Sequence, residues 1–444
     1  MLAAQNPVQV RHQLLERLAD ARSSTDDLFS VVKSDFLYER PIPERHRIIF
    51  YLGHLEAFDW NLLHERLLGL KAFNSELDRL FAFGIDPVGG GLPSDQPADW
   101  PSLRAVREYV GEVRSNLDAA IEKAIASDSG TNAHEHNASL LLNVAIEHRL
   151  MHAETFTYML HHLPLEWKNR RTQTAPPAAP PLKPEMIEIP EGVATLGLAR
   201  TEHVFGWDNE YEEHSLHVPR FAIDKYKVTN GQFLQFIAAG GYQNPELWSE
   251  ADWKWRTERD VSFPGFWRQM DGRWFLRTMF DNIPLPLDWP VYVSQAEAAA
   301  YARWVGKALP SEEQWHRAGY GTPQGTEQPF PWGTQAPDTA LGNFDFQRWD
   351  PVSVTAFEQG QSALGVVGML GNGWEWTSSL FKPFPGFERF SFYPGYSADF
   401  FDGKHYVIKG GSPRTAACML RRSFRNWFQP HYPYIYAGFR CVSN

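Results

Sequence analysis

A proline- and alanine-rich segment, residues 170–183, divides this chain of 444 residues into two parts. Its sequence, RRTQTAPPAAPPLK, shows no hydrophobic periodicity, and its prolines lack the backbone N–H that helices and sheets require. Such a composition is typical of an extended linker between domains. The chain is also too long for one ordinary hydrophobic core. We therefore predict a first domain over residues 1–168, a linker over residues 169–185 and a second domain over residues 186–444.

The first domain is predicted to be helical. Apolar residues recur at helical spacing in four stretches between residues 8 and 168. The stretches are Leu14, Leu15 and Leu18 continuing to Leu28 and Val31, then Ile48 to Phe58, Leu103 to Ile125, and His136 to His162. Four helices with modest connections indicate an up-and-down bundle, and the interior of such a bundle commonly holds a metal site.

The second domain has a different pattern. Short β-like runs at Met186–Ile189, Phe221–Ile223 and Tyr406–Lys409 alternate with turns rich in Gly, Pro, Asn and Asp. One helix is predicted over Ser294–Lys307, because Ser294 and the glutamate three residues later have the spacing of a capping box, and a shorter helix follows Leu309. The predicted fold class is α+β, with a loop-rich second domain whose irregular segments carry the function.

The composition excludes two classes of partner. The formal net charge of −11 lacks the basic excess that a nucleic-acid-binding surface needs. No apolar run approaches the length of a membrane span, and the first residues show no secretory leader. Cys418 and Cys441 are the only cysteines, which favours a reducing compartment over a disulfide scaffold. We expect a soluble cytoplasmic protein.

Two histidines in the last helical stretch are candidate metal ligands. His148 and His152 are separated by four residues, so on a helix their imidazoles lie on the same face, one turn apart. His54 lies on another predicted helix and could complete a set of three nitrogen ligands. With 16 histidines in 444 residues, about one such pair is expected by chance, so the pair alone does not separate a metal site from ordinary helix histidines.

Six short phrases stand out in the second domain. They are Ile223–Phe233 (IDKYKVTNGQF), Pro290–Ser294 (PVYVS), Ala302–Trp315 (ARWVGKALPSEEQW), Gly371–Thr377 (GNGWEWT), Lys409–Ser412 (KGGS) and Ala437–Arg440 (AGFR). This set resembles the formylglycine-generating-enzyme (sulfatase-modifying factor) fold, which has a C-type-lectin-like core. The first domain, with its HxxxH pair and the separate Leu-Gly-His54, resembles a DinB-like four-helix bundle. The fusion of the two in this order resembles the EgtB-type sulfoxide synthases.

The resemblance implies a chemistry and a metal. Those enzymes use non-haem iron(II) and O2 to join a sulfur donor to the imidazole C2 of hercynine, the trimethylated betaine of histidine. Their three iron ligands fall on His54, His148 and His152. Three neutral imidazoles leave the iron its full +2 charge and leave positions open for O2 and a soft thiolate or selenolate. Glu154 is a candidate acceptor for a ring N–H of these ligands, and it fits a solvated helix glutamate equally well.

The resemblance also assigns residues of the second domain. Tyr393 matches the family's tyrosine that donates a proton or hydrogen atom where oxygen reacts, a role that suits a phenol. Tyr396 matches a tyrosine that contacts hercynine. Asn426 and Trp427 match residues that hold the trimethylammonium group, since an aromatic face and an amide oxygen suit a cation with no N–H to donate.

The chain departs from the family at the donor site. Members that take cysteine or γ-glutamylcysteine bind its carboxylates with arginines after the second helix, but residues 80–103 contain no Lys or Arg. Phe428 replaces an aspartate suited to the donor's ammonium group, and Met151 stands where the family often has a hercynine-contacting glutamine. Unpaired donor charges would cost several kcal/mol if buried. A neutral, hydroxyl-rich donor suits a loop such as Asp86–Asp95.

The selenoneine synthase (SenA) branch of the family has this preference, and we place the chain there as a hypothesis. Its reaction would join a selenosugar to hercynine through a C–Se bond, with Fe(2+) as cofactor and O2 as co-substrate. The main alternative is a sulfoxide synthase for cysteine or γ-glutamylcysteine, with Arg414 or Arg422 holding the carboxylate. Three further alternatives are a copper-dependent formylglycine-generating oxidase, a DinB-type thiol transferase and a non-catalytic lectin-like binding protein.

Overall fold

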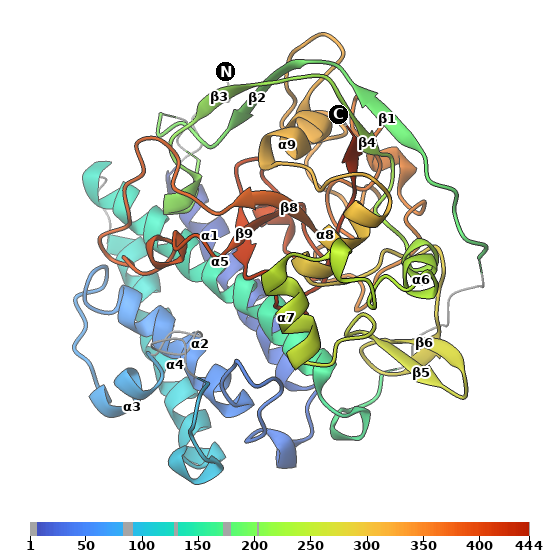
Figure 1. Ribbon diagram of the computed structural model, residues 1–444. Helices are drawn as coiled ribbons and strands as arrows, with labels where there is room; N and C mark the ends of the chain where they lie inside the picture. The colour runs from blue at the N-terminus through green and yellow to red at the C-terminus, as the bar shows by residue number, and fades with distance from the viewer. Residues whose placement is uncertain (1–6, 83–91, 128–131, 172–178, 202–203, 444) are drawn as a thin grey trace. The chain divides into compact units, whose positions relative to one another are not determined.

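The chain forms two compact units, residues 1–171 and 172–444. The structure, a computed structural model, describes residues 7–82, 92–127, 132–171, 179–201 and 204–443 (Figure 1). Part of the predicted linker, residues 172–178, lies outside the described residues, as do residues 86–91 of the loop proposed for the donor.

The first unit contains the four helices expected from the sequence and one short helix that the periodicity did not indicate. The helices are α1 (Pro7–Phe29), α2 (Ile48–Leu63), α3 (Ser75–Leu80), α4 (Leu103–Ser127) and α5 (Asn132–His162). Single 3-10 turns lie at Ser34–Phe36, Pro97–Asp99 and Leu165–Trp167. Helix α1 packs along α5, and α2 packs against both α4 and α5 (Figure 1). Helix α2 is buried on nearly all sides, as expected for a helix that is apolar around its whole circumference.

The first helix is shorter than its apolar pattern suggested. It ends at Phe29, so Val31 lies outside it. The backbone N–H groups of Val31 and Val32 donate to carbonyls three residues back, at 3.1 and 3.3 Å, which tightens the chain into a turn. Val32 then pairs with Lys168 in an isolated β-bridge. Val31 is fully buried all the same, because burial and not helical structure sets the position of an apolar residue.

The second unit is an α+β domain built on small sheets. Its four sheets have the strand orders β1-β4-β12, β10-β9-β8-β11, β2-β3 and β5-β6-β7. The strands are β1 (Met186–Ile189), β2 (Gly192–Leu196), β3 (His214–Val218), β4 (Phe221–Asp224), β5 (Trp267–Met270), β6 (Arg273–Arg277), β7 (Asn282–Pro284), β8 (Trp374–Leu380), β9 (Tyr406–Lys409), β10 (Asn426–Phe428), β11 (Ala437–Gly438) and β12 (Val442–Ser443). The three runs predicted as strands are confirmed as β1, β4 and β9, and β4 is one residue longer than predicted.

The helices that the structure describes in this unit include the two predicted from the sequence, α8 (Gln295–Trp304) and α9 (Glu312–Tyr320), and two that were not predicted, α6 (Asn230–Ala238) and α7 (Glu250–Glu258). Ser294 caps α8 and forms the predicted capping box with Glu297. Helix α8 ends at Trp304, three residues before the predicted end, because Gly306 has a φ of +70°. A glycine in that left-handed conformation closes a helix by turning the next N–H back onto it, and Lys307 donates to the carbonyl of Ala302 at 2.8 Å.

Four of the six phrases that carry the family resemblance meet at one buried carboxylate. Glu375 accepts two hydrogen bonds from Arg440, at 2.6 and 2.9 Å, and one from the indole N–H of Trp315 at 3.0 Å. Lys227 forms an ion pair with it at 2.9 Å. All four side chains are buried, so the carboxylate is stable there only because each oxygen is paired with a donor. The phrases are therefore structural and hold the core of this domain together.

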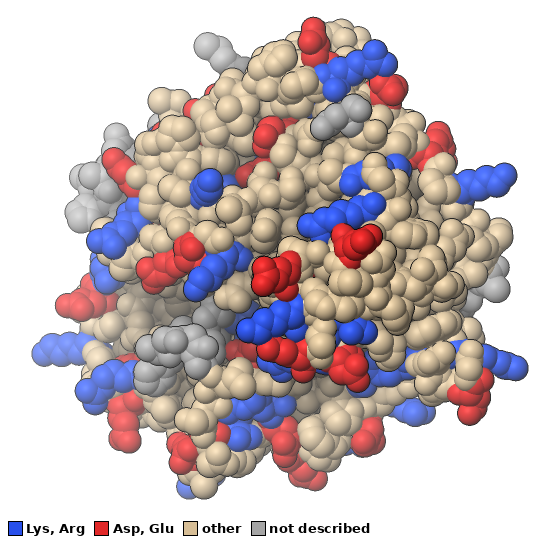
Figure 2. Space-filling view, viewed as in Figure 1, with Lys and Arg blue, Asp and Glu red and all other residues tan. Residues whose placement is uncertain are grey.

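The face of the molecule in Figure 2 carries acidic and basic side chains interspersed over the surface. Within the described part of the chain, no helix combines the length and the apolar character that crossing a membrane requires.

Candidate functional site

The three predicted histidines come together in the first unit. His54 projects from α2, and His148 and His152 project from α5. The Nε2 atoms of His54 and His152 are 3.2 Å apart, and those of His152 and His148 are 3.1 Å apart. One ring nitrogen from each of the three residues lies within 4.8 Å of the other two, and all three residues are buried. The four-residue spacing on α5 accounts for two of the three positions.

This arrangement fits a metal ion better than it fits hydrogen bonding. Two nitrogens that bind one ion at about 2.1 Å and at right angles lie about 3.0 Å apart, close to both observed separations. Without an ion, the Nε2 of His152 carries at most one proton and can donate to only one of its two neighbours. When Nε2 carries that proton it has no lone pair in the ring plane, so the other close contact has no hydrogen bond in a buried site. A bound cation removes this conflict, because it accepts one lone pair from each of the three rings.

The tautomer of His54 is set by the backbone. Its Nδ1 lies 2.7 Å from the carbonyl oxygen of Phe81, so Nδ1–H donates to this carbonyl. The lone pair is therefore on Nε2, the atom that faces the other two histidines. Metal-ligating histidines usually have this second hydrogen bond, which orients the ring and increases its basicity.

The site favours neutral imidazoles. Burial lowers the pKa of His54 to about 4, although its hydrogen bond to Phe81 acts in the opposite direction. Burial also places the pKa of His148 and of His152 well below the ordinary value, and the neighbouring histidines add to the effect. Neutral imidazoles are the form that binds a metal ion.

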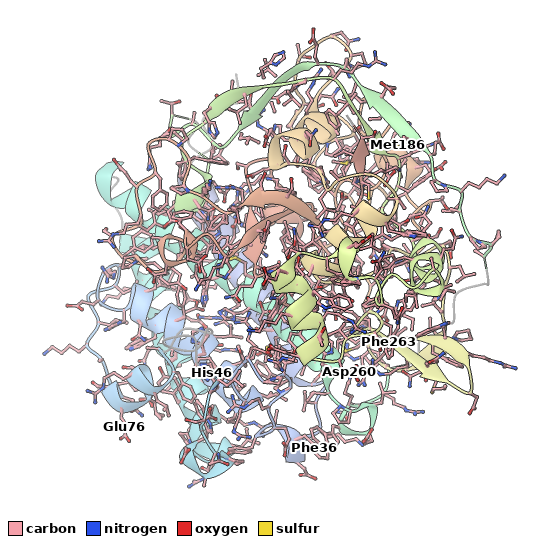
Figure 3. All side chains as sticks on the ribbon, viewed as in Figure 1. Phe36, His46, Glu76, Met186, Asp260 and Phe263 are labelled. Atoms are coloured by element: carbon pink, nitrogen blue, oxygen red, sulfur yellow. The ribbon has the colours of Figure 1, made fainter. Side chains whose placement is uncertain are left out.

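Aromatic rings restrict the orientation of two of the ligands. The ring of Phe58 stacks on His148 with centroids 3.3 Å apart and an angle of 10° between the planes. The ring of Phe50 stacks on His54 at 4.8 Å and 22°. Phe50 also contacts the ring of His46, labelled in Figure 3, at 4.3 Å. These contacts exclude water from the faces of the imidazoles.

A buried ion network that sequence reasoning missed joins α2 and α5 beside the histidines. Arg149, which follows His148, donates to Glu56 at 3.0 Å and to Asp59 at 2.6 Å. It also donates to the carbonyl of Leu55 at 3.0 Å. The three charged side chains are at most 1% exposed. The charged residues at positions 56, 59 and 149 are a signal in the sequence, since charges within an apolar helix pattern are buried only when they are paired.

The two other candidates on α5 have different degrees of burial. Glu154 is buried, which excludes the solvated-glutamate interpretation, and its role as acceptor for a ring N–H stays a prediction. Met151 is partly buried, and its contact with hercynine likewise stays a prediction.

The second unit brings three of its predicted residues into one aromatic cluster. Tyr396 lies 5.6 Å from Tyr393 and 5.6 Å from Trp427, measured between ring centroids. Trp207 stacks on Tyr396 at 4.0 Å, and the ring of Phe381 stacks on Trp427 at 4.1 Å. Sequence reasoning missed Trp207, which is 189 residues from Tyr396 and lies in a segment without strand or helix periodicity.

The other two predicted residues of this unit lie on the same strand as Trp427. Asn426 accepts the backbone N–H of Trp427 through its amide oxygen at 2.8 Å, which leaves that oxygen one further lone pair. Phe428 stacks on Tyr432 at 5.3 Å and 13°. Successive residues on a strand point to opposite faces, so Phe428 and Asn426 share one face of β10 and Trp427 lies on the other.

A carboxylate lies beside this aromatic cluster. Asp208 follows Trp207, is fully buried, and accepts the hydroxyl of Ser397 at 2.6 Å. Burial raises the pKa of Asp208, and the hydrogen bond from Ser397 partly offsets the increase. This acidic group next to Tyr396 was also missed, because it belongs to the same irregular segment as Trp207.

The arginines near the proposed donor positions have partners. Arg40 and Arg47 bind the carboxylate of Asp95, at 2.6 and 3.0 Å. Arg422 pairs with Glu213 at 3.2 Å and with Glu327 at 3.3 Å. Arg414 donates to the carbonyl of Phe346 at 2.8 Å and lies over the ring of Trp349 at 4.1 Å.

Neither cysteine forms a disulfide bond. Cys418 is exposed and Cys441 is buried, and burial raises the pKa of the Cys441 thiol well above its ordinary value. A buried thiol of high pKa lacks the thiolate character that copper binding and oxidation require.

The amino-acid sequence matches two protein families. Residues 172–444 match the family described as the sulfatase-modifying factor enzyme 1-like domain, and residues 17–156 match the DinB superfamily. The chain is 36% identical to the hercynine oxygenase of Mycolicibacterium thermoresistibile, with 97% of this chain and 95% of the relative covered. It is also 36% identical to the hercynine oxygenase of Mycolicibacterium smegmatis, with 97% and 99% covered. Ergothioneine biosynthesis protein 1 of Neurospora crassa is 28% identical, with 91% and 55% covered.

Proposed function

Because this chain belongs to the EgtB-type family, in which a DinB-type bundle precedes a sulfatase-modifying-factor domain, we propose that it is a selenoneine synthase. As a member of this family, the protein is an oxygenase-type, bond-forming enzyme. In the proposed reaction, the Se–H bond of a selenosugar and the C2–H bond of the hercynine imidazole break, a C–Se bond forms between selenium and C2, and O2 is the oxidant that takes up the two protons and the electrons. Release of selenoneine then requires cleavage of the bond between selenium and the sugar. The observation that carries the metal part of this proposal is the convergence of three buried Nε2 atoms.

His54, His148 and His152 would hold the ion. When bound, iron(II) supplies a redox-active centre with open positions for O2 and a soft selenolate. The protein keeps the three ligands neutral through burial and keeps the lone pair of His54 on Nε2 through the Phe81 carbonyl. Aromatic rings on His148 and His54 keep the imidazoles dry and in place.

We assign hercynine binding to the aromatic cluster and to the strand beside it. Tyr396 and Trp427 present aromatic surfaces that suit a trimethylammonium group. Asn426 has one lone pair on its amide oxygen beyond the one used by Trp427. The buried carboxylate of Asp208, which sequence reasoning did not include, adds negative charge beside Tyr396 when it is ionised. Met151 is an additional contact under this proposal.

Tyr393 would donate a proton at the place where O2 reacts. Its ring contacts Tyr396 at 5.6 Å and Trp207 at 6.5 Å, so the phenol lies in aromatic surroundings. A phenol can donate a proton to a base that forms next to it, which is the role proposed for Tyr393.

The choice of a selenosugar as the donor substrate rests on the charged side chains near the proposed donor positions. Residues 92–103, the described part of the segment after α3, contain no basic residue, and Arg40 and Arg47, which contact this segment, are paired with Asp95. The two arginines of the cysteine alternative are engaged as well, Arg422 by two carboxylates and Arg414 by backbone carbonyls. A carboxylate on the donor would have to break one of these pairs, whereas a sugar would not. Phe428 likewise provides no charge for an ammonium group.

We also propose a cytoplasmic location, since the two cysteines of this chain form no disulfide bond with each other.

The experiment is a direct substrate comparison. Iron-loaded protein is incubated with hercynine and O2 together with a 1-selenosugar in its selenol form, with cysteine or with γ-glutamylcysteine, and products are identified by mass spectrometry. We expect a conjugate of hercynine to form with the selenosugar and O2, and no conjugate to form with cysteine, with γ-glutamylcysteine or without O2. A product with cysteine alone would instead make the protein a sulfoxide synthase. No product with any donor, together with no metal in the purified protein, would favour a binding protein.

A further inference from the structure

The short helix α3 ends against a metal-ligand candidate. Helix α3 covers Ser75–Leu80, and Phe81 is its C-cap residue. The carbonyl groups at a helix C-terminus have no partner within the helix and must find one elsewhere. The carbonyl of Phe81 finds it in the Nδ1–H of His54, at 2.7 Å. The end of α3 therefore supplies the acceptor that orients this imidazole.

A glycine on α2 lets Phe81 come this close. Gly53 directly precedes His54, and a Cβ atom built on it would lie 2.5 Å from three atoms of the Phe81 ring. No carbon atom tolerates such a separation, so any other residue at position 53 would displace the ring. Because α2 is a regular helix, Gly53 is not required there for its backbone conformation. It serves as a notch that admits the ring of Phe81.

The ring of Trp100 packs against the ring of Phe81 and supports it. The two rings stack with centroids 6.2 Å apart and an angle of 21° between the planes. The indole N–H of Trp100 donates to Asp95 at 2.8 Å, and Asp95 is the carboxylate held by Arg40 and Arg47. The ring of Trp100 also meets Phe50 edge-on at 5.8 Å.

We propose that Phe81 is a positioning residue of the metal centre. Its backbone carbonyl holds His54 in the tautomer and ring plane that bind the ion, Gly53 is the notch that admits its ring, and Trp100 packs against that ring. This inference rests on the metal site of the proposed function, and it adds α3 to that site. Loss of a hydrogen bond of this kind costs about 10- to 100-fold in metal affinity.

The decisive variant is Gly53→Ala, with Gly111→Ala as the matched control. Both glycines lie within long helices, but a Cβ on Gly111 would meet nothing within 4 Å. The full-length protein is titrated anaerobically with Fe(II), and separately with Co(II), whose visible absorption reports the geometry of the ligands. The melting temperature of the metal-free protein is measured in parallel. We expect Gly53→Ala to bind about 10- to 100-fold more weakly with an altered Co(II) spectrum, and Gly111→Ala to bind as the wild type does.

A double variant tests the notch itself. Phe81→Leu keeps the backbone carbonyl and shortens the side chain, so the pair Gly53→Ala with Phe81→Leu should regain most of the affinity lost in Gly53→Ala alone. Regained affinity assigns the loss to the displaced ring. If the double variant binds no better than Gly53→Ala, the notch interpretation is wrong.

The outcomes separate this inference from the proposed function. If the wild-type protein binds neither metal, the metal centre itself is wrong. If the wild type binds and Gly53→Ala folds and binds within about twofold of it, only the role of Phe81 is refuted. If Gly53→Ala does not fold, Co(II) binding by the variant Trp100→Leu tests the role of Phe81 instead. Weaker Co(II) binding with an unchanged melting temperature of the metal-free protein supports the proposal, and unchanged binding refutes it.

Discussion

Arg149 is predicted to be the most sensitive position in the bundle. Its side chain is 1% exposed and binds Glu56 and Asp59, which are equally buried. The substitution Arg149→Met keeps the length and apolar character of the stem and removes the charge. Glu56 retains Arg114, at 2.7 Å, but Asp59 loses the ion pair that joins it to α5. The variant therefore leaves a carboxylate in a dry interior.

The cost follows from the burial. Breaking a buried ion pair by removing one partner costs about 3–5 kcal/mol, because the remaining charge has to be desolvated or neutralised. The matched control is Arg104→Met. Arg104 pairs with Glu108 at 3.4 Å on the surface of α4, with the two side chains 86% and 64% exposed. An exposed pair of this kind contributes only about 0.3–0.5 kcal/mol.

The assay is amide hydrogen exchange measured by mass spectrometry on the full-length protein. Peptides that cover α2 and α5 report the opening free energy of the bundle separately from that of the second unit. A single melting temperature would instead combine the stabilities of the two units. A loss of about 3–5 kcal/mol accelerates exchange in these peptides by about 10²- to 5 × 10³-fold, at about 1.4 kcal/mol per factor of ten. Peptides of the second unit serve as an internal reference.

Two results would count against this reasoning. If Arg149→Met accelerates exchange no more than Arg104→Met does, the network is not stabilising in the way its burial indicates. The double variant Arg149→Met with Asp59→Leu replaces the stranded carboxylate by an apolar group and should recover stability. If it remains as unstable as Arg149→Met, the damage comes from lost packing of the arginine stem and not from the carboxylate.

Three further predictions concern the metal, the donor and the pH dependence. His152→Ala should abolish metal binding and the increase in melting temperature on adding Co(II), measured by metal analysis and thermal denaturation, because its Nε2 contacts both other ligands. Phe428→Asp should lower the Kd for cysteine, measured by calorimetric titration, by at least about tenfold, since a charge-assisted hydrogen bond contributes about 1.5–3 kcal/mol; an unchanged Kd would place this side chain away from the donor. Burial raises the pKa of Glu327, but His316 and other partners outweigh it and lower this pKa from 4.5 to about 2. A lowered folded-state pKa contributes stability above pH 4.5 that is lost as the pH falls toward about 2. Glu327→Gln should therefore make the stability of the second unit depend less on pH in this range, measured by circular dichroism. The same substitution at the exposed Glu188 should leave the pH dependence unchanged.

Much of the local structure follows from short stretches of sequence. Helical periodicity predicts the four long helices, and the spacing of Ser294 and Glu297 predicts the first residue of α8. The four-residue spacing of His148 and His152 places two ligands on one face of α5. These features depend on contacts within one or two helical turns, so the sequence contains all the information they need.

The composition of each site depends on contacts between distant residues. The acceptor for His54 is 27 residues away, and the ring of Trp207 stacks on a tyrosine 189 residues later. No periodicity or spacing specifies such pairs, because packing selects among many residues of the same chemical type. The pairing of Arg40 and Arg47 with Asp95 is a second example, since charge type alone predicts neither partner.

The sequence by itself therefore determined the order of the two domains, the identity of the histidine trio and the absence of Lys and Arg from residues 80–103. Only the tertiary structure decided which groups orient those histidines, which arginines are already paired and which aromatic rings surround Tyr396. The physical reason is range: capping and periodicity act between neighbours along the chain, whereas burial and pairing of charges are settled when distant segments pack.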